Sequence, residues 1–342
     1  MKKLILDSIG SIPEFKFVET NIPEILDDEV LIKVSSVGVC YHDLLISEGT
    51  LRRGVKDNLV LGHEFSGQVV QFGESIKDLN KNDKIVSTLT SSCGYCDDCI
   101  NGNDYQCSNA EGFGHGIDGA LSEYLVLKRN NIIKLPQSFD MISSSLISCP
   151  IAVSFKALKD VARIQEGQTI VIFGCGGGLG IHAAQIAKAL GANVIGFTSS
   201  SDKLQKLYPF VDQLFLIEKD LDPSEVVLSL TGNKGADVVF NPVGSLFFKT
   251  SIDCLSNKGK MLILGQLDSS SVSINLAEIL FREISILGSV GADINHIHKV
   301  IDMISDKKIF PIIDHIIPIE RTTEAYKLLK SNVVSGRIVL TL

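Results

Sequence analysis

The sequence lacks long hydrophobic runs, blocks of basic residues, internal repeats and low-complexity linkers. None of its apolar stretches approaches the roughly 20 residues that a helix needs to cross a bilayer, so no membrane-spanning segment is expected. The net charge is −8 and lysines are interspersed with acidic residues, which disfavours nucleic acid or an anionic membrane as a partner. The apolar run after Met1 is too short for a secretory signal, so we expect a soluble cytoplasmic protein.

The composition provides ample core material for more than one domain. Of the 342 residues 45% are hydrophobic, and the mean hydropathy is +0.24. A chain of this length exceeds what one core normally fills, so two domains are expected. The first 150 residues contain short β-type runs between turn residues, as at 29–34, 67–72 and 83–87, which predict a β-rich domain.

From about residue 150 short apolar strands alternate with helical patterns. The run 169–174 is wholly apolar, as in a strand buried on both faces, and a helix is predicted at 181–190. Further strands are predicted at 193–197, 213–217, 236–240, 260–265 and 283–287. The alternation indicates an α/β fold with a doubly wound parallel sheet and crossover helices.

The sequence after about residue 285 predicts a helix at 296–306 and a last strand at 337–341. We therefore expect a nucleotide-binding domain inserted into the β-rich domain. The predicted divisions are 1–150, then 151–285, and a C-terminal return at 286–342 that completes the first domain.

Four cysteines are concentrated in one polar loop with the spacing C-x2-C-x2-C-x7-C. They are Cys93, Cys96, Cys99 and Cys107. Such a loop has little to bury and needs a cross-link, which a tetrahedral zinc or two disulfides would provide. The other cysteines, Cys40, Cys149, Cys175 and Cys254, are scattered singly, as in a reducing compartment. We therefore predict a structural zinc lobe at about 91–110.

A glycine-rich turn joins the strand 169–174 to its helix. Its residues are Gly174, Gly176, Gly177, Gly178, Leu179 and Gly180. A tight turn alone would explain glycines, but a preceding strand and a following helix favour dinucleotide binding, with the pyrophosphate at the helix N-terminus.

The end of the next strand bears on the choice of dinucleotide. NAD-binding chains usually carry an acid there for the ribose hydroxyl, and this chain instead has Thr198, Ser199, Ser200 and Lys203. Hydroxyls and a lysine suit a 2′-phosphate, so NADP(H) is preferred over NAD(H). Asp202 is interpreted as an N-terminal residue of the following helix.

A second group of metal-ligand residues is dispersed along the chain. Cys40, His63 and Cys149 form a ligand set that leaves one tetrahedral position open, as in catalytic zinc sites. Taken singly, each would more often be structural, and sequence separation alone leaves open whether they meet.

The stretch Gly62-His63-Glu64-x2-Gly67-x5-Gly73-x2-Ile76 resembles the zinc signature of the zinc-dependent medium-chain dehydrogenases, the alcohol dehydrogenase family. The resemblance extends over essentially the whole chain. It implies a GroES-like catalytic domain with an inserted Rossmann domain. It also implies a catalytic zinc held by Cys40, His63 and Cys149.

The same resemblance implies roles for further residues. Glu64 would exchange with the water on the metal, and Asp43 would orient His63. Gly265 and Ser289 join the predicted cofactor-binding residues, the latter in a segment expected under the nicotinamide. Pairing of the edge strand near 283–287 would give a homodimer or homotetramer.

His42 departs from the family pattern, in which a serine or threonine relays the proton of the substrate. An imidazole can also relay a proton, but a supporting or solvated role is the alternative. His115 is interpreted as a surface histidine without a partner, and His182 as packed or solvated. The spacing of His296 and His298 disfavours a joint metal site.

Three functions follow from these residues. The first is hydride transfer between NADP(H) and a small-molecule alcohol, aldehyde or ketone. The stretches Cys40–Leu45 and Glu111–Gly114 also resemble an archaeal subgroup that includes acryloyl-CoA reductases, so reduction of an enoyl thioester is the alternative. There, Arg52, Arg53 and Lys56 would meet the phosphates of the acyl carrier, or else form a solvated loop. The third is a non-catalytic NADPH-binding relative.

Overall fold

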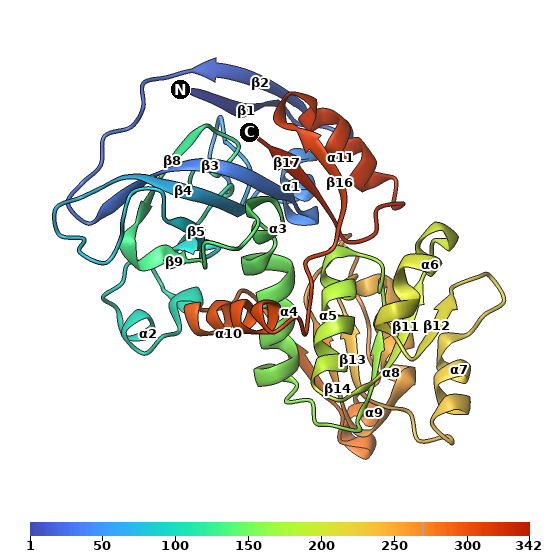
Figure 1. Ribbon diagram of the computed structural model, residues 1–342. Coiled ribbons are helices and arrows are strands. Elements are labelled where there is room, and N and C mark those ends of the chain that lie inside the picture. Colours follow the sequence, from blue (N-terminus) through green and yellow to red (C-terminus); the bar gives the residue numbers. More distant parts are fainter. Residues whose placement is uncertain (269) are drawn as a thin grey trace.

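Figure 1 shows the computed structural model, which describes residues 1–268 and 270–342. Two main sheets lie side by side, and the C-terminal part of the chain runs between them. In the described residues no helix is both long enough and apolar enough to cross a membrane.

One sheet has six parallel strands in the order β12-β11-β10-β13-β14-β15. This is the strand order of doubly wound dinucleotide-binding folds, in which the crevice for the ligand lies where the order reverses. The strands are β10 (Thr169–Ile172), β11 (Asn193–Thr198), β12 (Gln213–Leu216), β13 (Ala236–Asn241), β14 (Leu255–Ile263) and β15 (Ser285–Gly288). All six strands expected from the sequence are present.

Helices connect these strands. They are α5 (Gly178–Ala189), α6 (Leu204–Leu207), α7 (Pro223–Leu230), α8 (Phe248–Cys254) and α9 (Leu276–Arg282). The predicted start of the first helix at residue 181 was wrong, because α5 begins inside the glycine cluster. A Cβ at Gly180 would clash with the carbonyl oxygen of Gly174, so only glycine lets the first turn pack this closely on the end of β10.

The other main sheet has the order β16-β17-β3-β4-β5-β9, with β8 also paired to β3. Its strands are β3 (Glu29–Val39), β4 (Glu64–Phe72), β5 (Lys84–Ser87), β8 (Tyr124–Lys128), β9 (Ile132–Lys134), β16 (Ile313–Pro318) and β17 (Arg337–Thr341). The C-terminal strand β17 pairs antiparallel with β3, with Ile338 opposite Val39. The end of the chain therefore returns to the sheet formed by the N-terminal part of the chain, as the sequence predicted.

Smaller elements surround this sheet. The strand pairs are β1 (Lys2–Ser8) with β2 (Glu14–Glu19) and β6 (Thr90–Ser91) with β7 (Glu111–Gly112). The helices are α1 (Tyr41–Ser47), α2 (Asp97–Ile100), α3 (Met141–Ser144), α4 (Ala152–Lys156), α10 (Ile294–Ser305) and α11 (Thr322–Lys330).

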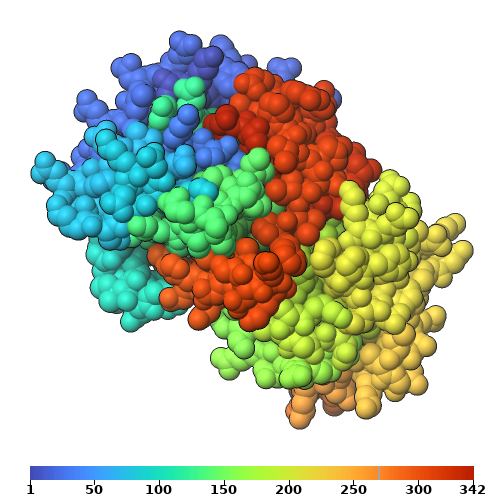
Figure 2. Space-filling model, in the orientation of Figure 1, coloured from blue at the N-terminus to red at the C-terminus, as the bar shows by residue number. Residues whose placement is uncertain are grey.

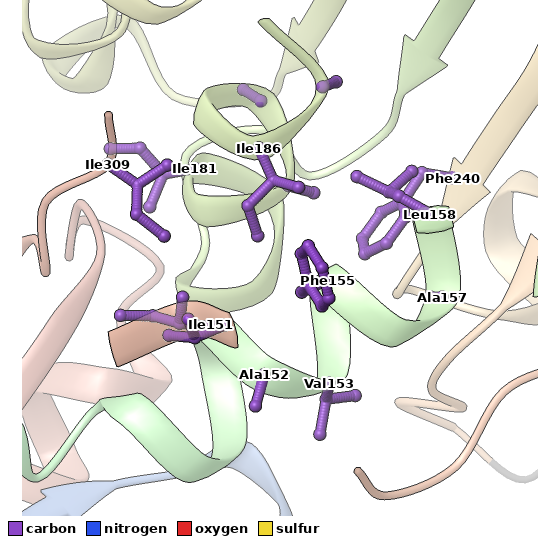
Figure 3. Packing of buried hydrophobic residues seen from close by; sticks show 14 of the residues in the cluster. Ile151, Ala152, Val153, Phe155, Ala157, Leu158, Ile181, Ile186, Phe240 and Ile309 are labelled. Carbon is purple, nitrogen blue, oxygen red and sulfur yellow. The ribbon is translucent and has the colours of Figure 1, made fainter. Parts of the chain in front are cut away.

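A shared hydrophobic core joins the two sheets. The cluster includes Val86 of β5 and Ile133 of β9 from the N-terminal sheet, and Ile170 and Ile172 of β10 from the parallel sheet. Figure 3 shows its centre, where residues 151–158 pack against α5, with Phe155 beside Ile186. In the space-filling view the C-terminal segment fills the junction between the two parts (Figure 2). The core fixes residues 147–151 in place, and this segment carries one of the predicted metal ligands.

Candidate active site and cofactor cleft

The structure brings the dispersed ligand candidates together. One ligand atom each from Cys40, His63, Glu64 and Cys149 lies within 4.8 Å of all the others. All four side chains are at least nine-tenths buried. Two thiols and an imidazole around one point match the ligand set of a catalytic zinc, and Glu64 adds a carboxylate beside it.

Local structure explains how each ligand reaches this point. Cys40 follows β3 and is the N-cap of α1, and His63 directly precedes β4, which pairs with β3. Cys149 lies on a π-helical turn, Ile147–Ile151, that contains Pro150. Proline has no N–H to donate, and the Ile151 amide bonds back to the carbonyl of Leu146 at 3.4 Å.

Asp43 contacts the imidazole of His63, which is the contact that its predicted orienting role requires. Its Oδ1 lies 2.9 Å from Nδ1 of His63, and Asp43 is fully buried. This contact leaves Nε2 of His63 available to a metal. The pKa of Cys40 is lowered well below its usual value by a hydrogen bond from Cys149 and by the charge of Arg337, which favours the thiolate form.

Arg337, at the start of β17, completes the site and was missed by the sequence analysis. Its Nε and Nη2 donate to the two carboxylate oxygens of Glu64 at 3.1 and 2.8 Å, and Nη2 lies 3.4 Å from Sγ of Cys40. Burial raises the pKa of Glu64 to about 7, and the arginine charge opposes that rise. A Cβ at Gly178 would clash with this guanidinium, so Arg337 also lies against the glycine turn.

His42 has a partner that the sequence did not reveal. Its Nε2 lies 3.2 Å from Nδ1 of His115, and Nε2 of His115 lies 2.8 Å from the carbonyl oxygen of Arg53. The interpretation of His115 as a histidine without a partner was therefore wrong. A carbonyl only accepts, so Nε2 of His115 carries the hydrogen, its Nδ1 accepts, and Nε2 of His42 donates.

The second ligand group lies in the loop around α2. The thiols of Cys93, Cys96, Cys99 and Cys107 converge within 4.8 Å of one another, and all eight cysteines of the chain are free. The Cys93 and Cys99 sulfurs are 3.9 Å apart. Zn–S bonds of about 2.3 Å in a tetrahedron place sulfurs about 3.8 Å apart, so the loop fits a zinc better than two disulfides.

The predicted cofactor residues lie along one edge of the parallel sheet. Gly174, Gly176 and Gly177 lie between β10 and α5, with Gly177 as the N-cap, and Gly178, Leu179 and Gly180 form the first turn of this helix. Gly265 and Ser289 follow β14 and β15 at the same edge. The hydroxyl of Ser289 is buried and has no hydrogen-bond partner among the described residues, so it remains available to a ligand.

The residues predicted to meet a 2′-phosphate are at the end of β11. Thr198 is buried, Ser199 is exposed, and Ser200 precedes a short 3-10 turn, Ser201–Lys203. Asp202 lies exposed within this turn. The ammonium of Lys203 donates to Oδ1 of Asn332 at 3.1 Å.

Within the part of the chain that the structure describes, none of the other histidines belongs to a group that could hold a metal. His182 is packed, as expected, between the carbonyl of Gly178 and the amide of Ile312. His296 is buried between Asp160 and Asp293, whereas His298 is exposed.

Comparisons with known proteins agree with this geometry. A model of the alcohol dehydrogenase GroES-like domain matches residues 26–137, and a model of a zinc-binding dehydrogenase matches residues 178–306. Together they cover more than two thirds of the chain. An acryloyl-coenzyme A reductase from Sulfurisphaera tokodaii is 28% identical over 327 residues, which are 95% of this chain and 96% of that protein.

This chain belongs to the zinc-type medium-chain dehydrogenase/reductase family. A solved NAD-dependent alcohol dehydrogenase is similar over 100% of both chains, with 26% identity and a TM-score of 0.93. A protein from Sinorhizobium meliloti 1021 was solved with NADP bound. It is similar over 100% of this chain and 99% of its own chain, with 26% identity and a TM-score of 0.84.

Family membership confirms the predicted fold, a Rossmann-type sheet with a GroES-like domain. Membership also identifies the protein as a hydride-transferring oxidoreductase. Structural relatives include one named for NAD and one bound to NADP, so the fold alone does not select the dinucleotide.

Proposed function

We propose that the protein is a zinc-dependent, NADP(H)-preferring oxidoreductase that interconverts a small alcohol and its aldehyde or ketone. The observation that carries this proposal is the meeting of Cys40, His63 and Cys149, with Glu64 beside them, in one buried cluster. A zinc held by the two thiols and the imidazole would keep its fourth position for the substrate. The thiols of Cys93, Cys96, Cys99 and Cys107 would hold a second, structural zinc.

The catalytic zinc, when bound, would supply Lewis-acid polarisation of the substrate oxygen. Asp43 holds His63 in the tautomer that presents Nε2 to the metal. Arg337 balances the charge of Glu64 in the buried cluster. The same guanidinium adds positive charge at the glycine turn, where the pyrophosphate of the dinucleotide would bind.

Proton movement would pass through His42. Burial lowers the pKa of His42, so the neutral imidazole prevails at neutral pH, with Nδ1 free to accept a proton. Its Nε2 hydrogen would then move to Nδ1 of His115, which is only half-buried. In the direction of carbonyl reduction the same contacts would deliver the proton.

Reduction of an enoyl thioester is the second candidate, and it is favoured by the similarity to an acryloyl-coenzyme A reductase over 95% of the chain. Arg52, Arg53 and Lys56 are exposed near His115, where the phosphates of an acyl carrier would find positive charge. Lys56 already pairs with Asp118 at 2.8 Å, which leaves the two arginines as the available cations.

This proposal is tested by measuring the oxidation of NADPH and of NADH by the purified protein. One series of substrates contains aldehydes and ketones, and the other contains acryloyl- or crotonyl-CoA. We expect faster NADPH-dependent turnover of a carbonyl compound. Turnover of the acyl-CoA alone, with a raised KM in Arg52→Glu/Arg53→Glu, would establish the second candidate. A protein that binds NADPH and zinc but turns over neither series would be a non-catalytic relative.

We further infer a homodimer formed through β15, the last strand of the parallel sheet. Within the described residues the outer edge of β15 has no strand partner. The neighbouring helix α9 exposes Leu276, Leu280 and Phe281, which are 72%, 70% and 80% accessible. Large apolar side chains grouped beside a free sheet edge are typical of a subunit interface.

A further inference from the structure

Asn332 connects the C-terminal loop to the predicted 2′-phosphate residues at the end of β11. Its Oδ1 accepts from Nζ of Lys203 at 3.1 Å, and its Nδ2 donates to Oγ of Ser199 at 3.1 Å. Asn332 lies between α11 and β17, about 130 residues away in sequence. One amide thus contacts two of the four residues that the sequence selected for this role.

Lys203 carries a buried positive charge with few partners. The side chain is 4% exposed, and among the described residues the amide oxygen of Asn332 is its one hydrogen-bond acceptor. The nearby carboxylate of Asp314 is already paired with Lys206 and His315. An ammonium has three donors, so two remain for a ligand, and a buried charge without an ion partner favours an anion.

The loop that carries Asn332 is held on the glycine turn by backbone contacts. The amide of Gly336 donates to the carbonyl of Gly176 at 3.0 Å, and Gly177 and Gly336 form an isolated β-bridge. Asn332 itself has φ +60°, a left-handed conformation that asparagine and glycine tolerate best. These backbone features place Asn332 beside the residues at the end of β11.

We propose that Asn332 is a specificity-determining residue that positions Lys203 and Ser199 for the 2′-phosphate of NADP(H). This inference rests on the proposed NADP(H) preference. It adds Asn332, from the C-terminal loop, to the residues that would surround the 2′-phosphate. The neutral amide orients the ammonium without cancelling its charge. A carboxylate at the same position would pair with Lys203 and repel the phosphate.

Asn332→Asp tests this proposal, because it changes the charge and keeps the shape and the preferred backbone conformation. Isothermal titration with NADP⁺ and NAD⁺ gives the two dissociation constants without any turnover. We expect Asn332→Asp to bind NADP⁺ about tenfold to a hundredfold more weakly, the range of one or two charge-assisted hydrogen bonds. NAD⁺ lacks the phosphate, so its affinity should stay within about threefold.

Two further variants separate recognition from structure. Asn332→Gly removes both side-chain hydrogen bonds and retains the left-handed backbone, so it should lose NADP⁺ affinity to a smaller degree than Asn332→Asp. Asn233→Asp is the matched control, since Asn233 is exposed, has φ +61° and follows α7 away from this loop. It should bind both dinucleotides as the wild type does.

The outcomes distinguish this inference from the function on which it rests. A wild type that binds NADP⁺ and NAD⁺ equally would overturn both the cofactor preference and the role of Asn332. A wild type that prefers NADP⁺, with Asn332→Asp keeping that ratio, would overturn the role of Asn332 alone. The same holds if Asn332→Asp weakens both dinucleotides equally, since that is a structural effect.

Discussion

His182 shows how one buried imidazole joins the cofactor turn to the C-terminal segment. Its Nδ1 lies 2.6 Å from the carbonyl oxygen of Gly178, and its Nε2 accepts from the amide of Ile312 at 2.9 Å. Only the neutral ring has one donor and one acceptor in this arrangement. Burial lowers the pKa of His182 to about 4.

This shift makes the stability of the protein depend on pH. An unfolded histidine binds a proton near pH 6.5, whereas folded His182 does so only near 4, so the free energy of unfolding should fall as the pH drops between these values. The loss from this group would be about 3 kcal/mol. His182→Gln retains a donor and an acceptor without titrating, so its urea-unfolding midpoint should vary less over this range. Equal pH dependence of both proteins would contradict the assignment.

Single residues also show what the sequence could and could not predict. The four residues of the buried ligand cluster were predicted, because they belong to recognisable motifs. Arg337 and Asn332 were missed, because they act on residues 273 and about 130 positions away, and no local pattern marks an arginine at the start of a strand as a buried partner. The contact of His115 with His42 was missed for the same reason.

At the scale of secondary structure, the predictions succeeded for the parallel strands and failed at irregular turns. The apolar runs of β10, β11 and β13 are buried on both faces and have a clear signal. β14 begins at Leu255, five residues before the predicted strand, in a polar stretch that gives little indication of pairing. The π-helical turn around Cys149 depends on Pro150 and on packing against α5, which a sequence pattern does not contain.

The cysteine loop illustrates an element without a core of its own. Helix α2 has four residues and none of them is buried. A metal bound by the four thiols would therefore contribute most of its folding energy. In Cys99→Ser we expect faster amide hydrogen exchange across residues 93–107 and unchanged protection in β10 to β15, measured by mass spectrometry. Cys254→Ser, which removes a buried free thiol from α8, is the control. Unchanged exchange in the loop of Cys99→Ser would argue against a structural metal.

At the scale of the whole molecule, the shared core and the C-terminal return hold the buried ligand cluster against the edge of the parallel sheet where the predicted cofactor residues lie. Strand β17 contributes Arg337 to this cluster, and the loop before it reaches Gly176. Sequence patterns predicted that the chain returns to the first sheet. They did not predict that the returning segment contacts both the buried ligand cluster and the glycine turn, because these contacts depend on how the two sheets are arranged in space.

The apolar face of α9 leads to a prediction about assembly. Phe281→Glu places a charge in the proposed interface and should convert a dimer into a monomer in light scattering coupled to size exclusion. Tyr208→Glu changes another exposed aromatic residue, 59% accessible and directly after α6, and should leave the mass unchanged. A wild-type monomer, or a Phe281→Glu dimer, would refute the proposed interface.

Zinc content measured by mass spectrometry, together with turnover of the same samples, tests the central claim most directly. The wild type should contain two zinc equivalents per chain, and Cys40→Ser should contain one and lose its activity. A zinc bound by Cys40, His63 and Cys149 would keep a fourth position for substrate, whereas the four thiols of the cysteine loop would fill the coordination of the other zinc. A wild type with a single equivalent, and full turnover in Cys40→Ser, would contradict it.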